Sequence, residues 1–133
     1  MKLVYPAVFY PDEEEGGYTV EVPDLPGCVS EGDDMAEAIL MAVDAASGWI
    51  LGEWENGEAT PDASGLGDIR PEDGGIVSLI ALDMDAYAEK YGKTAVRKNL
   101  TIPAYLNTAA EAAGINFSKV LQDALEQRLF PAV

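Results

Sequence analysis

The sequence contains no histidine and a single cysteine, Cys28. Without histidine, the commonest general base, the commonest metal ligand and the usual Ser-His-Asp and Cys-His arrangements are excluded. A single cysteine also excludes an internal disulfide and any zinc site built from several cysteines. These absences argue against an enzyme, and we expect no catalytic residue, no metal site and no cofactor.

The sequence also lacks a long apolar run and a secretory signal. No apolar run approaches the roughly 20 residues that span a bilayer. The first 15 residues, MKLVYPAVFYPDEEE, lack the basic, apolar and small-residue order of a signal peptide. We therefore expect a soluble cytoplasmic protein with no membrane association. Hydrophobic residues make up 48% of the chain, which is enough to bury a core.

Basic residues are scarce and unevenly placed. The chain has eight basic and 24 acidic residues, a net charge of −16. Residues 1–88 hold 20 acidic and two basic residues, whereas residues 89–133 hold four acidic and six basic residues. Such asymmetry favours two parts with different partners, although acidity can also serve solubility alone. The most unusual stretch is VRKNLTIP, residues 96–103, which places two basic residues on a β-like segment.

The first part of the chain predicts a small α+β domain. Residues 2–10 and 18–22 indicate a two-stranded hairpin, and residues 27–32 a short third strand. Asp33 or Asp34 can cap a helix that runs to Asn56-Gly57. The residues expected to be buried recur at helical spacing: Ala36, Ile39, Leu40, Val43, Ala46, Ile50 and Trp54. Residues 58–75 predict a long loop, and the apolar residues 76–84 predict the most central strand. The expected order is β-β-β-α-β.

The second part predicts a strand followed by two helices. A short helix over residues 85–93 ends in a hinge at Gly92, and residues 96–102 then indicate a strand. Pro103 suits the first position of a helix that stops at Gly114, and Asn116 or Ser118 can cap a second helix. A lone strand has no partner for its backbone. The economical solution is a symmetric dimer in which two strands pair antiparallel and pack on four helices.

The outer face of such a ribbon suits DNA. The two-residue period of a strand places Arg97, Asn99 and Thr101 together. A two-stranded ribbon fits the major groove, where arginine contacts guanine and asparagine contacts adenine, and a helix N-terminus can hold phosphate. The expected DNA-binding residues are Arg97, Lys98, Asn99, Thr101, Asn116, Ser118 and Lys119. The alternative is an ordinary solvated strand face.

Two stretches resemble known families. Residues 96–129, VRKNLTIPAYLNTAAEAAGINFSKVLQDALEQRL, resemble a ribbon-helix-helix domain of the MetJ/Arc type in the strand, the proline, the glycine turn and the second helix. Residues 5–39, with their DLPGC and EGDD stretches, resemble the HicB family of antitoxins. The joining segment LDMDAYAEKYGKTAVRKNLTIP also resembles that family, so the resemblance covers nearly the whole chain.

The resemblance implies a non-catalytic, ribonuclease-H-like N-terminal fold that binds a HicA-type toxin, a small basic mRNA-cleaving ribonuclease. It also implies an antitoxin that represses its own operon by binding operator DNA as a homodimer or a dimer of dimers. We assign residues 1–88 to toxin binding, 89–95 to a hinge and 96–133 to a ribbon-helix-helix domain. The expected toxin-binding residues are Asp24, Glu31, Asp33 and Asp34.

Other interpretations stay open at this point. The four carboxylates above and Asp44 could bind Mg²⁺ for nuclease chemistry, although helix capping and solvation explain them more simply. Cys28 is better explained as a small buried residue than as a nucleophile. Trp54 fits the core, whereas Trp49 could anchor a partner. The chain could also be a non-catalytic protein-binding domain whose C-terminal tail only dimerises.

Overall fold

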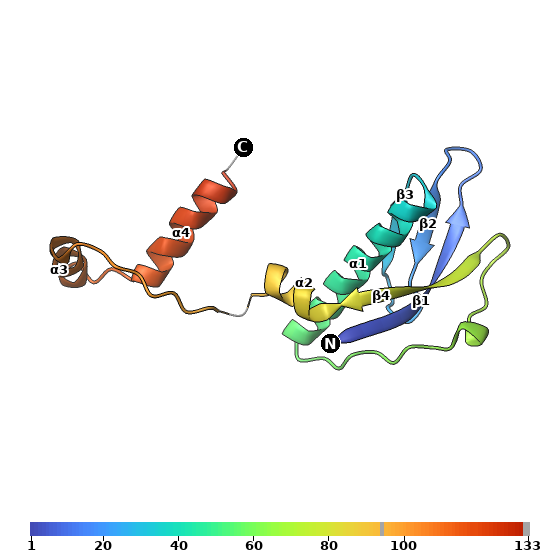
Figure 1. The fold of residues 1–133 in the computed structure, drawn as a ribbon, viewed down its shortest axis with the longest axis horizontal. Coiled ribbons are helices and arrows are strands. Elements are labelled where there is room, and N and C mark those ends of the chain that lie inside the picture. The colour runs from blue at the N-terminus through green and yellow to red at the C-terminus, as the bar shows by residue number, and fades with distance from the viewer. Residues whose placement is uncertain (94, 132–133) are drawn as a thin grey trace. The chain divides into compact units, whose positions relative to one another are not determined.

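The computed structural model describes residues 1–93 and 95–131, and the chain divides into two compact units, Met1–Thr94 and Ala95–Val133. The last two residues of the expected domain 96–133 lie outside the described residues. Figure 1 shows both units. The first unit contains β1 (Lys2–Pro11), β2 (Tyr18–Glu21), β3 (Val29–Gly32), α1 (Met35–Glu55), the short 3-10 helix η1 (Leu66–Asp68), β4 (Ile76–Asp83) and α2 (Met84–Tyr91). The α+β fold and its β-β-β-α-β order are therefore as predicted.

The four strands form one antiparallel sheet in the order β3-β2-β1-β4. β1 lies in the interior of the sheet, and β4 pairs with β1 alone among the described strands, so the prediction that residues 76–84 form the most central strand is wrong. The composition of β4 suggested a central strand because both of its faces carry apolar residues, but one edge of the strand has no neighbouring strand among the described residues. Ile80 and Leu82 are buried, whereas Ile76 is 44% and Leu79 49% exposed.

The core lies between the sheet and α1. Tyr5, Ala7 and Phe9 alternate along β1 and belong to one buried cluster with the small residues of α1, Ala38, Ala42 and Ala46. The helix begins where Asp34 accepts a hydrogen bond from the backbone N–H of Glu37 at 2.7 Å, so Asp34, and not Asp33, is the cap. Asn56 and Gly57, the latter with a φ of 77°, end it.

The predicted buried face of α1 is only partly correct. Ala46 and Ile50 are buried, and Val43 and Trp54 pack partly against the core. The expectation is wrong for Ala36, Ile39 and Leu40, which are exposed. The reason is close packing: a Cβ built on Gly32 would lie 2.7 Å from the Cα of Ala38. The helix therefore turns its alanines, and not its largest side chains, toward β3.

By length and composition alone, α1 could cross a membrane, and it is the one helix in the described part of the chain that passes this test. The core helix of a water-soluble protein passes the same test. Here Ala38, Ala42, Ala46 and Ile50 pack into the core against the sheet, which accounts for part of the apolar composition.

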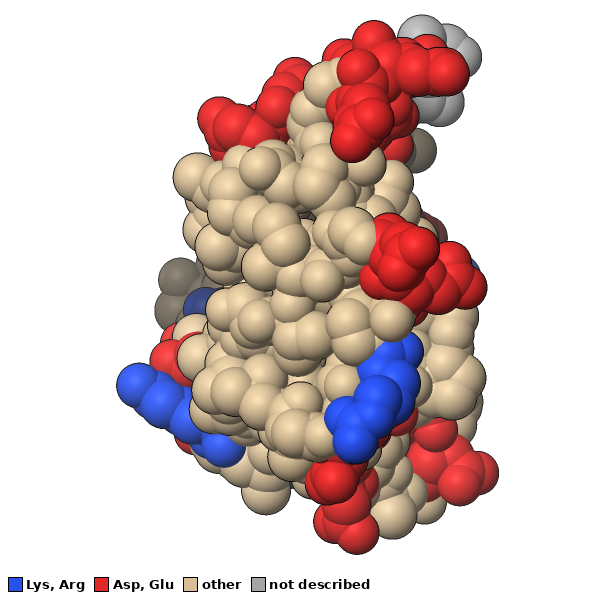
Figure 2. Space-filling view, turned by 90° about the vertical axis from the view of Figure 1, so that its right-hand side faces the viewer, with Lys and Arg blue, Asp and Glu red and all other residues tan. Residues whose placement is uncertain are grey.

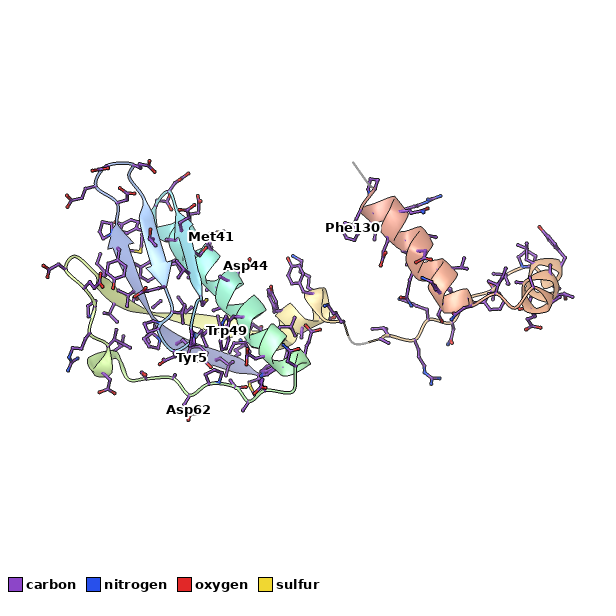
Figure 3. The ribbon with its side chains drawn as sticks, turned by 180° about the vertical axis from the view of Figure 1, so that it is seen from behind. Tyr5, Met41, Asp44, Trp49, Asp62 and Phe130 are labelled. Atoms are coloured by element: carbon purple, nitrogen blue, oxygen red, sulfur yellow. The ribbon has the colours of Figure 1, made fainter. Side chains whose placement is uncertain are left out.

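The long loop between α1 and β4 is tied down by side chains. The Tyr5 hydroxyl donates to the Pro61 carbonyl at 2.5 Å, and Trp54 Nε1 donates to Thr60 Oγ1 at 2.7 Å. The carboxylate of Asp24 accepts from the backbone N–H and the hydroxyl of Ser64, at 2.8 and 2.6 Å. Tyr5 lies beside the loop segment that carries Asp62 (Figure 3). The predicted loop is therefore ordered against the domain.

The second unit contains α3 (Ala104–Ala112) and α4 (Phe117–Leu129) and buries no side chain among its described residues. Pro103 caps α3 one position before its first residue, Gly114 follows α3 with a φ of 68°, and Asn116 caps α4. Residues 96–102 form no strand in the single chain. A strand needs a neighbour for its ladder of hydrogen bonds, and the described residues of one chain offer none to this segment.

Candidate functional site

An acidic hollow opens where the β1–β2 turn meets the start of α1. It has a volume of about 220 Å³. The acidic residues that line it are Asp12, Glu15, Glu31, Asp33 and Glu37. The turn is held tightly against β3, because a Cβ on Gly17 would lie 3.1 Å from the Cα of Asp33. Five carboxylates from three chain segments thus share one concave surface, and such a surface attracts cationic side chains.

The hollow contains two of the four expected toxin-binding residues, Glu31 and Asp33. The other two already have structural partners, since Asp34 caps α1 and Asp24 holds Ser64. Sequence reasoning missed Asp12, Glu15 and Glu37. The hairpin register would have found them: Thr19 pairs with Glu31, which places the preceding turn beside the β3–α1 junction.

The carboxylates do not form a metal site in the described part of the chain, where no group of three or more His, Cys, Asp or Glu side chains could hold an ion. Asp44, the fifth carboxylate of the nuclease alternative, lies further along α1. Cys28 is buried, and burial raises the pKa of its thiol. A thiol in that state is a poor nucleophile at neutral pH.

The DLPGC stretch and Trp49 have a shared structural role. Gly27 adopts a φ of 82°, and the backbone of Leu25 and Cys28 closes a turn in which Leu25 is fully buried. Trp49 Nε1 donates to the Pro26 carbonyl at 3.0 Å. The tryptophan therefore fastens this turn to α1.

The expected DNA-binding residues all lie in the second unit and are exposed. Arg97, Lys98, Asn99 and Thr101 lie on the unpaired segment before α3. Asn116 uses its side-chain oxygen to cap α4 at the Lys119 N–H, and Lys119 Nζ lies 3.4 Å from Asp123. Ser118 lies in the first turn of α4. In the single chain Leu100 is exposed, as are Arg97, Asn99 and Thr101, so neither face of the segment is buried.

The charge of the first unit is concentrated around its rim. Figure 2 shows one face on which acidic side chains gather at the top, where the β1–β2 turn lies in Figure 1. The middle of that face carries uncharged residues. Further acidic side chains lie at the right-hand and lower edges of this face, and the acidic hollow lies at the same turn as the group at the top.

Comparison with known proteins assigns this fold to a family. Residues 5–124 match a family model described as "HicB_like antitoxin of bacterial toxin-antitoxin system". The chain is 35% identical over 107 residues to an "uncharacterized 14.9 kDa protein in rep-hol intergenic region" of Haemophilus phage HP1, covering 78% of this chain and 76% of that protein.

Two solved structures share the fold. A toxin–antitoxin complex from Streptococcus pneumoniae contains a chain with a TM-score of 0.74 and 24% identity, over 96% of this chain and 99% of that one. The Burkholderia pseudomallei antitoxin HicB has a TM-score of 0.56 and 24% identity, over 96% of this chain and 98% of that one.

Proposed function

This chain belongs to the HicB-like antitoxin family of bacterial toxin–antitoxin systems, and we propose that it neutralises a HicA-type toxin and represses its own operon. The first unit binds the toxin and the second binds operator DNA as a dimer. The observation that carries the proposal is the family match, which extends over both units.

The electrostatics of the first unit support toxin binding. Residues 1–88 carry a net charge of −18, and five carboxylates converge on the acidic hollow. A small basic ribonuclease would be steered toward such a surface, and its association rate would fall with added salt. One structural relative is itself part of a toxin–antitoxin complex.

The second unit supports a dimer that reads DNA. Its unpaired segment 96–102 and the exposed apolar residues Leu100, Ile102 and Leu125 need a partner surface. A second copy supplies both, because two such segments pair antiparallel about a two-fold axis. Arg97, Asn99 and Thr101 then face the major groove, and the N-terminus of α4 with Ser118 and Lys119 faces phosphate.

We propose that the protein acts in the cytoplasm by binding its partners and does not catalyse a reaction. The family is generally non-catalytic. In this chain the capping role of Asp34 and the loop contact of Asp24 account for two carboxylates of the nuclease alternative. Purified protein should therefore cleave neither RNA nor DNA with Mg²⁺ or Mn²⁺.

The test is co-expression of the full chain with a small basic toxin of the HicA type. Growth should stop when the basic protein is expressed alone and recover when both are present, and the two should co-purify. An electrophoretic shift with DNA from upstream of the operon tests repression. Toxicity that persists beside soluble antitoxin refutes the first function. An unshifted operator refutes the second and favours a tail that only dimerises.

A further inference from the structure

An exposed apolar pair interrupts the acidic surface of the first unit on the N-terminal half of α1. Leu40 is 69% exposed and Met41 43% exposed. Glu37 precedes Leu40 by three positions and Asp44 follows it by four, so both acids border the pair on the helix surface. Met41 and Asp44 follow one another along α1 in Figure 3. We call Glu37, Leu40, Met41 and Asp44 the α1 surface.

The fold does not need these four side chains for its own packing. The core side of α1 is made by Ala38, Ala42 and Ala46, and neither Leu40 nor Met41 belongs to the buried cluster. Glu37 and Asp44 make no ion pair with any residue that the structure describes. The apolar area and the two charges are therefore both available to a partner.

We infer that the α1 surface is where the toxin docks, through an apolar patch ringed by lysine and arginine side chains. This inference rests on the proposed toxin binding and adds the location of the binding surface on the first unit. An apolar centre surrounded by a polar rim is the usual anatomy of a protein interface, and large central side chains contribute most of the affinity. A negative rim selects a positive one.

The acidic hollow extends the same surface. Glu37 lines the hollow and also borders Leu40, so the two features meet at this residue. A basic partner seated on Leu40 and Met41 would place further cationic side chains toward Glu31 and Asp33. A second copy of this unit fits less well, because its Glu37 and Asp44 would face the same two acids.

The experiment measures the affinity of the purified full chain for a purified HicA-type toxin by calorimetry. The double variant Leu40→Ser/Met41→Ser should lose affinity by about 100-fold or more, as expected for two central side chains. Its matched control is Leu66→Ser, since Leu66 is also a surface leucine, 46% exposed, but lies in η1. The control should stay within about twofold of the wild type.

A second pair of variants tests the rim. Glu37→Gln/Asp44→Asn should slow association by about tenfold at low salt and weaken its salt dependence. Glu53→Gln/Glu55→Gln removes two charges from the other end of the same helix and should change the rate much less. Circular dichroism of every variant should match the wild type, because none of these side chains is buried.

The outcomes separate the location from the function. Tight wild-type binding that Leu40→Ser/Met41→Ser leaves unchanged overturns the α1 surface but not toxin binding. A wild type that fails to bind overturns the proposed function, and the location with it. A variant that binds toxin normally but has a smaller mass than the wild type assigns the surface to contacts between copies and also overturns the inference.

Discussion

Asp24 joins two segments that are 40 residues apart in the sequence. Both of its carboxylate oxygens accept hydrogen bonds from Ser64, and its negative charge lies close enough to affect Tyr5. Burial raises the pKa of the Tyr5 hydroxyl, and the charges of Asp24 and Asp62 raise it further. One carboxylate therefore both fastens the loop and disfavours the tyrosinate.

Replacing Asp24 with alanine should lower the free energy of unfolding by about 1–3 kcal/mol, because the polar groups of Ser64 lose their acceptor. It should also lower the pKa of Tyr5, measured by ultraviolet absorbance in an alkaline titration. Asp62→Ala is the control, since Asp62 affects Tyr5 only through its charge. This variant should lower the pKa of Tyr5 with little loss of stability. Equal stability of the two variants would refute the fastening role of Asp24.

Arg97→Ala should abolish operator binding and leave toxin binding intact. One lost guanine contact costs about 1–3 kcal/mol, and a dimer loses it twice, so roughly 2–6 kcal/mol is expected if the losses add. Asn99→Ala should weaken specific binding without changing the salt slope, because asparagine neutralises no phosphate. An electrophoretic shift assay at several salt concentrations measures both. Wild-type binding by the Arg97 variant would mean that the segment is a solvated face.

At the scale of elements, Gly32 sets how closely β3 approaches α1. A Cβ at this position would lie 2.7 Å from both the Cα of Ala38 and the carbonyl carbon of Glu37. These are backbone atoms of the helix, which cannot move without displacing α1 from its core contacts. The small residue therefore determines the packing distance on which the whole buried face depends.

Gly32→Ala should destabilise the protein by about 1–3 kcal/mol, because the helix must shift to relieve the overlap. Gly52→Ala is a matched control, since it adds the same methyl group within α1, where nothing lies within 4 Å. That change should instead stabilise the protein by about 0.5–1 kcal/mol through helix propensity. Urea denaturation measures both. A Gly32 variant as stable as the wild type would show that the contact relaxes freely.

The positions of helices and strands along the chain were predicted better than the buried side of α1 and the pairing of β4. Hairpin alternation, a helix start at Asp33 or Asp34 and the stop at Gly114 depend on local chemistry, and each could be predicted from a few residues. The face of α1 could not, because alanine packing near Gly32 outweighs the size of Leu40 and Ile39. The edge position of β4 depends on which strands pair, and composition alone does not encode that pairing.

The candidate site was predictable only in part for a related reason. Glu31 and Asp33 stood out as acids beside a helix start, but Asp12 and Glu15 join them only through the hairpin register. Asp24 looked like a surface acid because its partner Ser64 is remote in the sequence. Contacts that arise from strand pairing or from a long loop cannot be predicted from the local sequence around either residue.

At the scale of the whole molecule, the two units differ in how they are stabilised. The first has its own buried core, whereas the second leaves its apolar residues exposed, with Leu100 at 64%. Leu100→Asp should therefore convert the proposed dimer to a monomer, since a charge cannot be buried without a partner. Light scattering should report half the mass, and near-ultraviolet circular dichroism should show an intact first unit. A dimer of unchanged mass would place the contact elsewhere.

The absence of a strand at residues 96–102 in the single chain has a consequence for dosage. On the proposed dimer, the order of the second unit depends on the protein concentration, while the order of the first does not. By mass action, a tenfold fall in free monomer lowers the dimer about 100-fold. As the protein becomes scarce, operator occupancy would therefore fall steeply, while each remaining monomer would still bind toxin. Transcription of the operon would resume before neutralisation of the toxin fails, and newly made antitoxin would then restore repression.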